Sequence, residues 1–357
     1  MSIKELFKIM RDKEASDLFL RINSSPKMRI FSDVVKVSDD VIRPQDMERI
    51  VDELLDDTKK SLFKVHKDID FAVYVEDLGR FRISMFFQRN TPSVVIRRVK
   101  PQIFSFQELN LPGQVLSQLC MERRGLILVT GAAGSGKSTT IASMIEYINT
   151  QRYAHILTIE EPIEFIFQDK KSIINQRELG LDVKDYDMAL RQFTLQSPDV
   201  IYIGTIRDPK TMSSALTAAE TGVLVFSTLH TINAFQTIER IINFFPPYQH
   251  KQVFLQLSLL LKGVISLRLI KRADHQGMIP AYEIMTLSPT ISRLLREAKI
   301  WEIPRYMEEG EIYGMTTFKK TLLELVKGGR ISSQDALDYA DSREDMLMEL
   351  KNLGIES

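Results

Sequence analysis

The stretch from Leu126 to Thr140, which reads LILVTGAAGSGKSTT, limits the possible folds of this chain more than any other. Its centre, Gly131 to Ser138, has glycines, a lysine and a serine at the spacing of a phosphate-binding loop. The apolar run Leu126 to Val129 predicts a buried strand before the loop, and Ser138 to Tyr147 predicts a helix after it. A glycine turn that merely precedes a helix is the alternative, but this order of strand, loop and helix favours a phosphate site.

The residues of this loop have the chemistry to hold a nucleotide. Glycines let backbone N–H groups point at phosphate oxygens, and the start of the helix adds partial positive charge to the same anion. Lys137 would reach the β- and γ-phosphates, while the Ser138 hydroxyl would ligate Mg²⁺. The predicted phosphate-binding set is Gly131, Ala132, Ala133, Gly134, Ser135, Gly136, Lys137, Ser138 and Thr139, with Ser138 as the metal ligand.

Composition excludes several other classes of protein. The chain has 357 residues, enough for two or three domains, and equal numbers of basic and acidic residues, 47 each, which gives no case for nucleic-acid binding. Cys120 is the only cysteine, so an internal disulfide and a thiolate metal site are excluded, as suits a reducing cytoplasm. No uncharged apolar run approaches 18 residues, so we expect no transmembrane segment, and the start of the chain lacks the apolar core of a signal peptide.

The first 98 residues predict a small α+β domain. Short alternating runs indicate strands, and two segments have helical apolar spacing. A proline-bounded connector, residues 99–112, is the predicted linker. The predicted helices are Ile3–Met10 and Pro44–Leu62, and the predicted strands are Asp17–Ile22, Lys27–Phe31, Asp70–Val75, Gly79–Phe87 and Ser93–Arg98.

From about residue 113 helices and strands alternate, which is typical of an α/β domain with a mostly parallel sheet. The apolar segment Val253–Ile270 is interrupted by polar residues and is interpreted as a packed helix. From about Pro289 onward the chain is predicted to be helical. The predicted strands of the sheet are Leu126–Val129, His155–Ile159, Val200–Ile203 and Leu224–Thr228.

Three of these strands end in polar residues, and the carboxyl ends of parallel strands form the ligand-binding edge. Glu160, Glu161 and Glu164 follow one strand and could hold Mg²⁺ or polarise the attacking water. Beside a phosphate loop this role is favoured over that of a charged loop. Another strand ends at Thr205, a neutral hydroxyl where an acidic residue is expected. His230 follows the fourth strand and could sense the γ-phosphate or serve a structural role.

Motifs spread over nearly the whole chain resemble, in order, the secretion-type ATPases of type IV pili, most closely the retraction ATPases PilT and PilU. Besides the phosphate loop they include an acidic box at Glu160–Glu164 and a histidine box at Thr228–His230. Features such as the helical tail lean toward PilU. The other matching segments are Ala15–Leu18, Gly79–Arg82, Asn175–Glu178, Thr217–Gly222 and Ile291–Glu297.

The resemblance implies a PAS-like N-terminal domain (residues 1–98), a RecA-like ATPase domain (113–288) and a C-terminal helical region (289–357). It also implies binding of ATP and Mg²⁺, a cytoplasmic ring of six subunits on the pilus machine, and contacts with an inner-membrane platform protein and a PilT-type paralogue. Arg82 and Arg97 match the arginines that such rings place against a neighbour's phosphates. A guanidinium there stabilises developing phosphoryl charge, although both could instead be solvated strand residues.

The chain departs from the family pattern at positions that serve hydrolysis. Thr205 stands where the family usually has glutamate, and Val223 where it has the first histidine of the histidine box. Glu161 and Gln196 replace the usual aspartate and arginine. We therefore expect an ATP-driven retraction motor, with a ring subunit that binds ATP but hydrolyses it weakly as the alternative. An extension ATPase is disfavoured because that class carries a four-cysteine metal site.

Overall fold

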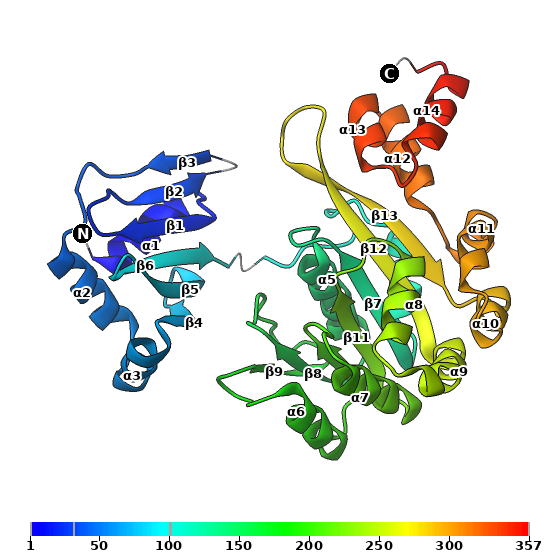
Figure 1. Cartoon of the computed structure of the whole chain (residues 1–357), viewed down its shortest axis with the longest axis horizontal. Helices are drawn as coiled ribbons and strands as arrows, with labels where there is room; N and C mark the ends of the chain where they lie inside the picture. Colours follow the sequence, from blue (N-terminus) through cyan, green and yellow to red (C-terminus); the bar gives the residue numbers. More distant parts are fainter. Residues whose placement is uncertain (1, 31–32, 100–101, 356–357) are drawn as a thin grey trace. The chain divides into compact units, whose positions relative to one another are not determined.

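The computed structural model of the chain describes residues 2–30, 33–99 and 102–355. It divides into two compact units, one of residues 1–102 with 164–166, the other of residues 103–163 with 167–357. Both combine sheets with helices (Figure 1). Among the described residues no helix is both long and apolar enough to cross a membrane.

The first unit is a six-stranded antiparallel sheet in the order β3-β2-β1-β6-β5-β4, with three helices. Its core joins the apolar side of the first helix to the sheet, where Phe7 stacks on Phe81 with ring centroids 4.1 Å apart. The predicted α+β architecture of this region is therefore present. Its elements are α1 (Ile3–Asp12), β1 (Asp17–Arg21), β2 (Lys27–Ile30), β3 (Asp33–Lys36), α2 (Pro44–Leu54), α3 (Asp57–His66), β4 (Asp68–Val75), β5 (Gly79–Gln88) and β6 (Thr91–Arg98).

The prediction of one helix over Pro44–Leu62 is wrong. Leu55 is extended (φ −113°, ψ 129°), so α2 ends there and α3 begins two residues later. The side chain of Asp56 accepts a hydrogen bond from the Lys59 backbone N–H at 2.8 Å and caps the new helix. The apolar spacing continued across the break and concealed the cap. In the predicted strand Lys27–Phe31, Phe31 lies outside the described residues.

The second unit contains a seven-stranded sheet in the order β13-β12-β7-β11-β10-β8-β9, parallel except for β13. Alternate residues of β7 serve two cores: Leu126 and Leu128 in one, Ile127 and Val129 in the other. Helices thus cover both faces, and the predicted α/β fold class is confirmed. The elements up to the fourth predicted strand are α4 (Gly113–Cys120), β7 (Gly125–Gly131), α5 (Lys137–Gln151), β8 (His155–Glu160), β9 (Ile173–Glu178), α6 (Tyr186–Phe193), β10 (Val200–Ile203), α7 (Pro209–Glu220) and β11 (Leu224–Leu229).

The prediction of a packed helix over Val253–Ile270 is also wrong. The helix ends at Leu260, and Leu261 begins a strand that pairs in parallel with β7. That strand then forms an antiparallel hairpin with the next one. Apolar content alone could not separate a buried helix from a buried strand. The elements here are α8 (Ala234–Asn243), α9 (His250–Leu260), β12 (Leu261–Lys271) and β13 (Met278–Thr286).

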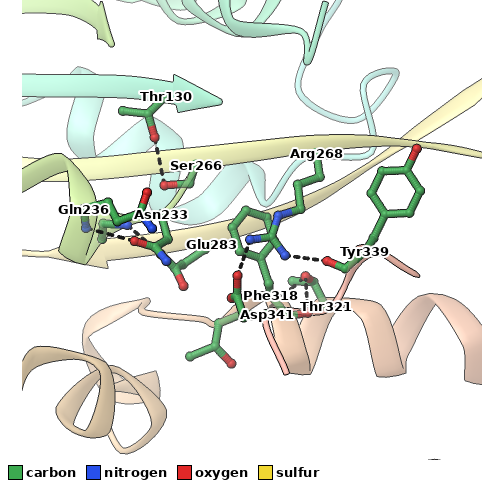
Figure 2. A network of polar contacts seen from close by, with 12 residues as sticks. Thr130, Asn233, Gln236, Ser266, Arg268, Glu283, Phe318, Thr321, Tyr339 and Asp341 are labelled. Carbon is green, nitrogen blue, oxygen red and sulfur yellow. Dashed lines mark hydrogen bonds and ion pairs between the residues drawn. The ribbon is translucent and has the colours of Figure 1, made fainter. Parts of the chain in front are cut away.

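In the described residues five α-helices follow, largely as predicted from Pro289 onward, and β12 contacts the segment that carries the last three of them. Arg268 of β12 lies over the Phe318 ring at 3.7 Å and pairs with Asp341 (Figure 2). Two residues earlier, Ser266 accepts a hydrogen bond from Thr130 at 2.9 Å. One strand therefore contacts both the end of β7 and the C-terminal helices. These are α10 (Pro289–Arg296), α11 (Ile303–Glu308), α12 (Phe318–Lys327), α13 (Ser333–Tyr339) and α14 (Arg343–Asn352).

Most of the predicted linker packs on the second unit. Phe106 is buried in the core that also holds Ile127 and Val129, with its ring 5.5 Å from that of Tyr147. The Ser143 hydroxyl donates a hydrogen bond to the Phe104 carbonyl at 2.5 Å. Residues 103–112 therefore belong to the second unit, while Lys100 and Pro101 lie outside the described residues.

Candidate active site

The loop between β7 and α5 has a backbone that only glycine allows at key positions. Gly131, Gly134 and Gly136 have φ values of +142°, +77° and +94°. A Cβ on Gly131 would lie 2.5 Å from the Leu267 carbonyl oxygen and 2.4 Å from the Ser135 hydroxyl. Close approach and positive φ both require glycine there.

Lys137 begins α5 and is folded over the loop. Its Nζ donates to the carbonyl oxygens of Gly131 at 2.9 Å and Ala132 at 2.8 Å, and the residue is buried. The Ser135 hydroxyl is also buried and has no hydrogen-bond partner among the described residues. A cationic side chain, an unsatisfied hydroxyl and a helix N-terminus fit a phosphate group. Ala132, Ala133 and Gly134 are exposed around this cradle, and Gly136, Ser138 and Thr139 are half-buried.

The donor set also fits Mg²⁺. Ser138 lies in the first turn of α5, directly after the loop, and is half-buried. In the described ranges no group of three His, Cys, Asp or Glu side chains could hold a metal alone. Magnesium accepts such a site because it keeps several waters and takes its other ligands from substrate phosphates.

The acidic box divides into one fixed and two exposed carboxylates. Glu160 is the last residue of β8 and is buried; its Oε1 accepts hydrogen bonds from Thr158 at 2.7 Å and Gln176 at 3.1 Å. Glu161 is exposed and forms an ion pair with Arg207 at 3.0 Å. Glu164 is exposed in an irregular segment after β8. Glu160 is thus the carboxylate that the fold holds in one position.

The end of β10 carries hydroxyl groups. The Thr205 hydroxyl lies 3.0 Å from that of Thr228, which donates to the Gly204 carbonyl at 2.6 Å. These bonds tie the end of β10 to the end of β11. A threonine here can neither carry negative charge nor take a proton as a carboxylate would.

His230 directly follows β11 and belongs to the same charged surroundings. Desolvation, and then the positive charges of Lys137 and Arg207, lower the pKa of His230 below its ordinary value. The imidazole is therefore neutral at neutral pH and can donate or accept a hydrogen bond. The loop lysine and Arg207 therefore both lie within electrostatic reach of His230, whose role as a γ-phosphate sensor stays a prediction.

One residue of this edge was not predicted. Tyr186, the first residue of α6, has a buried hydroxyl with no hydrogen-bond partner in the described part of the chain. Burial, and then the charge of Glu161, raise the pKa of Tyr186 to about 12. Tyr186 is part of the apolar pattern of a helix, which indicates only a packing role, so nothing in the sequence marks it as a site residue.

The two predicted arginines lie in the first unit. Arg82 on β5 and Arg97 on β6 are directly opposite in the antiparallel register. Arg97 donates through Nε to buried Asp17 at 2.8 Å, and Asp17 also pairs with Arg29 at 3.2 Å. Arg82 is half-buried and Arg97 exposed, so both side chains reach solvent from the sheet.

Known proteins that are similar to this chain are secretion-system and pilus ATPases. The family described as "Type II/IV secretion system protein" matches residues 13–327. "Type IV pilus ATPase PilU" of Pseudomonas aeruginosa is 38% identical over 100% of this chain and 93% of its own length. "Type IV pilus retractation ATPase PilT" of the same organism is 38% identical over 95% of this chain and 98% of its own. A crystal structure titled as the pilus retraction motor PilT with bound ADP has a TM-score of 0.90 at 40% identity, covering 97% of this chain and 98% of that one.

These similarities confirm the predicted resemblance to pilus retraction ATPases and the assignment as an ATPase. Identity to PilU and to PilT is equal at 38%, so the leaning toward PilU stays a prediction. The chain belongs to the family of type II and type IV secretion system proteins and is related to the pilus ATPases PilU and PilT, over 100% and 95% of its length respectively.

Proposed function

We propose that this chain is an ATP-hydrolysing motor of a type IV pilus that drives pilus retraction and twitching motility. The observation that carries the proposal is the phosphate loop, in which buried Lys137 closes over glycines with positive φ. This loop is part of a fold similar over 97% of the chain to that of the retraction motor PilT, whose crystal structure holds ADP. Lys137 and the loop N–H groups would bind the phosphates of ATP, and Ser138 would hold Mg²⁺.

Hydrolysis would take place beside the end of β8. Mg²⁺, when bound, would neutralise part of the phosphate charge. Water attacks the γ-phosphorus, the bond to the bridging oxygen breaks, and ADP leaves with the electron pair. Glu160, fixed by Thr158 and Gln176, would take the proton of the water, and neutral His230 would sense the γ-phosphate. Glu161 would keep Arg207 at this edge through their ion pair, and Glu164 would contribute a further carboxylate of the acidic box.

The motor would act as a ring of six copies in the cytoplasm, held at the inner membrane by the pilus machine. Arg82 and Arg97 would stabilise phosphoryl charge on a neighbouring subunit's nucleotide. Rotation of the two domains about the linker would convert hydrolysis into movement. The partners would be the platform protein of the pilus and a PilT-type paralogue.

Thr205 favours a second candidate, an accessory ring subunit that binds ATP but turns it over slowly. Its hydroxyl bonds to Thr228 and supplies no general base. ATP turnover by the purified protein, alone and with a PilT-type partner, separates the two candidates when ATP binding is measured in parallel. Brisk turnover alone supports the motor, whereas tight binding with turnover only beside the partner supports the accessory role.

The ring arrangement has its own test. Arg82→Ala and Arg97→Ala should each impair turnover without unfolding the chain, because the arginines act on a neighbour's nucleotide. Mixing either variant with Lys137→Ala should restore some activity at hybrid interfaces. Mixed rings that are verified by mass and stay inactive would contradict action between subunits.

A further inference from the structure

The hydroxyl of Tyr186 is a buried donor that nothing in the described fold satisfies. Its oxygen is covered and has no hydrogen-bond partner among the described residues. The backbone N–H of Thr205 also acts on this phenol, but outside hydrogen-bond geometry, and leaves the hydroxyl proton without an acceptor. Burying an unsatisfied hydroxyl costs roughly as much as a lost hydrogen bond, so its presence at one site needs a reason.

This hydroxyl lies at the end of β10. A Cβ on Gly204 would be 3.4 Å from the Tyr186 oxygen and 3.3 Å from the Glu160 Cα, so the tyrosine reaches the space between the ends of β10 and β8. The charges of Glu161, Arg207 and Glu160 all act on the phenol. The orphan donor therefore faces the edge at which hydrolysis is proposed.

We propose, on the basis of the proposed ATPase function, that the Tyr186 hydroxyl donates a hydrogen bond to the water that attacks the γ-phosphate and thereby orients it. Thr205 supplies only a hydroxyl group at this strand end, and that hydroxyl lies 3.0 Å from the Thr228 hydroxyl. Catalytic hydrogen bonds are often unformed without substrate and tighten in the complex, which accounts for the unsatisfied state.

The chemistry assigns Tyr186 to orientation rather than to proton transfer. With its pKa raised to about 12, the phenol stays protonated at neutral pH and is a donor, not a base. The water oxygen attacks the γ-phosphorus, ADP leaves with the electrons of the broken P–O bond, and the water proton passes to Glu160 and then to solvent. Tyr186 keeps its own proton throughout.

The test is Tyr186→Phe in the full chain, which removes only the hydroxyl. We expect kcat to fall about tenfold or more, with ATP affinity changed less than about twofold. The melting temperature without nucleotide should stay equal or rise, because the change deletes an unsatisfied buried group. Tyr153→Phe is the matched control, since Tyr153 is 88% exposed and its hydroxyl is not buried.

A second arm asks whether Tyr186 and residue 205 serve the same water. In a Thr205→Glu background, Tyr186→Phe should cost less than about threefold, because the new carboxylate orients the water instead. Full additivity, an unchanged kcat in the single variant, or a joint fall of kcat, affinity and melting temperature would overturn the inference. A parent that binds ATP but never hydrolyses it is a different result: it refutes the motor function and, with it, the oriented water.

Discussion

Two strand ends of one parallel sheet, those of β7 and β10, differ in how they build their part of the site. The end of β7 works through its backbone: three glycines with positive φ shape a cradle that Lys137 closes. The end of β10 works through side chains from separate segments, with Thr205 bonded to Thr228 and Tyr186 unsatisfied beside them. In the proposed function, nucleotide binding and hydrolysis would therefore rest on different parts of the chain, and a substitution could change one without the other.

The largest expected effect is at the end of β7. Lys137→Ala should weaken ATP binding at least about 100-fold, because it removes a buried charge from the phosphate cradle. Calorimetric titration with ATP measures the loss, circular dichroism checks the fold, and exposed Lys251→Ala is the control. Equal affinity in variant and parent would mean that the backbone alone holds the phosphates.

Glu160→Gln tests whether the proton goes to the end of β8. The amide keeps the shape of the side chain but cannot take a proton, so turnover should fall ~10²-fold or more while ATP affinity stays within a few-fold. Steady-state kinetics and nucleotide titration check this, with exposed Glu344→Gln as control. Retained turnover would move the general base to another carboxylate, with Glu161 the next to test.

Glu283 lies on β13, an edge strand of the same sheet, and tests whether a buried carboxyl group there affects stability or the function of the β7 and β10 ends. Burial raises the pKa of Glu283 from 4.5 to about 7, although its carboxylate accepts a hydrogen bond from the Ala234 N–H at 2.8 Å. The folded state then holds a proton that the unfolded state loses, so stability should fall as pH rises from about 4.5 through about 7, by at most about 3 kcal/mol.

Glu283→Gln should remove this pH dependence and stabilise the chain at pH 8.5 relative to the parent. Denaturant midpoints at pH 5 and pH 8.5 measure the difference, and exposed Glu239→Gln on α8 is the control. A parent and variant with the same pH dependence would show that the buried carboxyl does not govern stability. Equal ATP affinity in the parent and in Glu283→Gln would show that this distant carboxyl group does not affect nucleotide binding at the end of β7.

The smallest expected effect bears most directly on the comparison. Thr205→Glu should raise turnover by at least about tenfold, while ATP affinity stays the same. This gain is small compared with the rate enhancement of ~10²–10⁴ that a positioned general base typically contributes. Single-turnover kinetics with pre-bound ATP isolate the chemical step, and Thr205→Gln controls for size without charge. If the parent already hydrolyses ATP rapidly and neither variant changes that rate, the end of β10 has no part in activating water.

The difference between the ends of β7 and β10 also decides how much of the site can be predicted from the sequence. The phosphate loop, its strand and its helix are consecutive residues, so spacing and periodicity were sufficient to find them. Glu160 and His230 were predicted as site residues because they follow predicted strands, and their roles stay predictions. Tyr186 was not predicted, because its place depends on which distant segments the sheet order brings together.

Errors in the fold have a related cause. In Val253–Ile270 the apolar content is the same for a buried helix and a buried strand, and only pairing of its second half with β7 decides between them. In Pro44–Leu62 a single capping residue, Asp56, divides a segment whose apolar spacing continues across the break. Local patterns thus predict whether most elements are helices or strands, but not the residues at which one element ends and the next begins.

Strand β12 constrains how this chain can be recombined with its relatives. The Leu267 carbonyl lies where a Cβ on Gly131 would fall, and the next residue, Arg268, holds Phe318 and Asp341 of the C-terminal region. A chimera that exchanges only α12–α14 for those of a relative would replace the residues that contact Arg268. A crossover before β12 instead moves the strand, its arginine and the helices together. The seam then consists of the main-chain pairing with β7, the Thr130–Ser266 hydrogen bond and the apolar residues that β12 packs into both cores of β7, so those side chains must be matched.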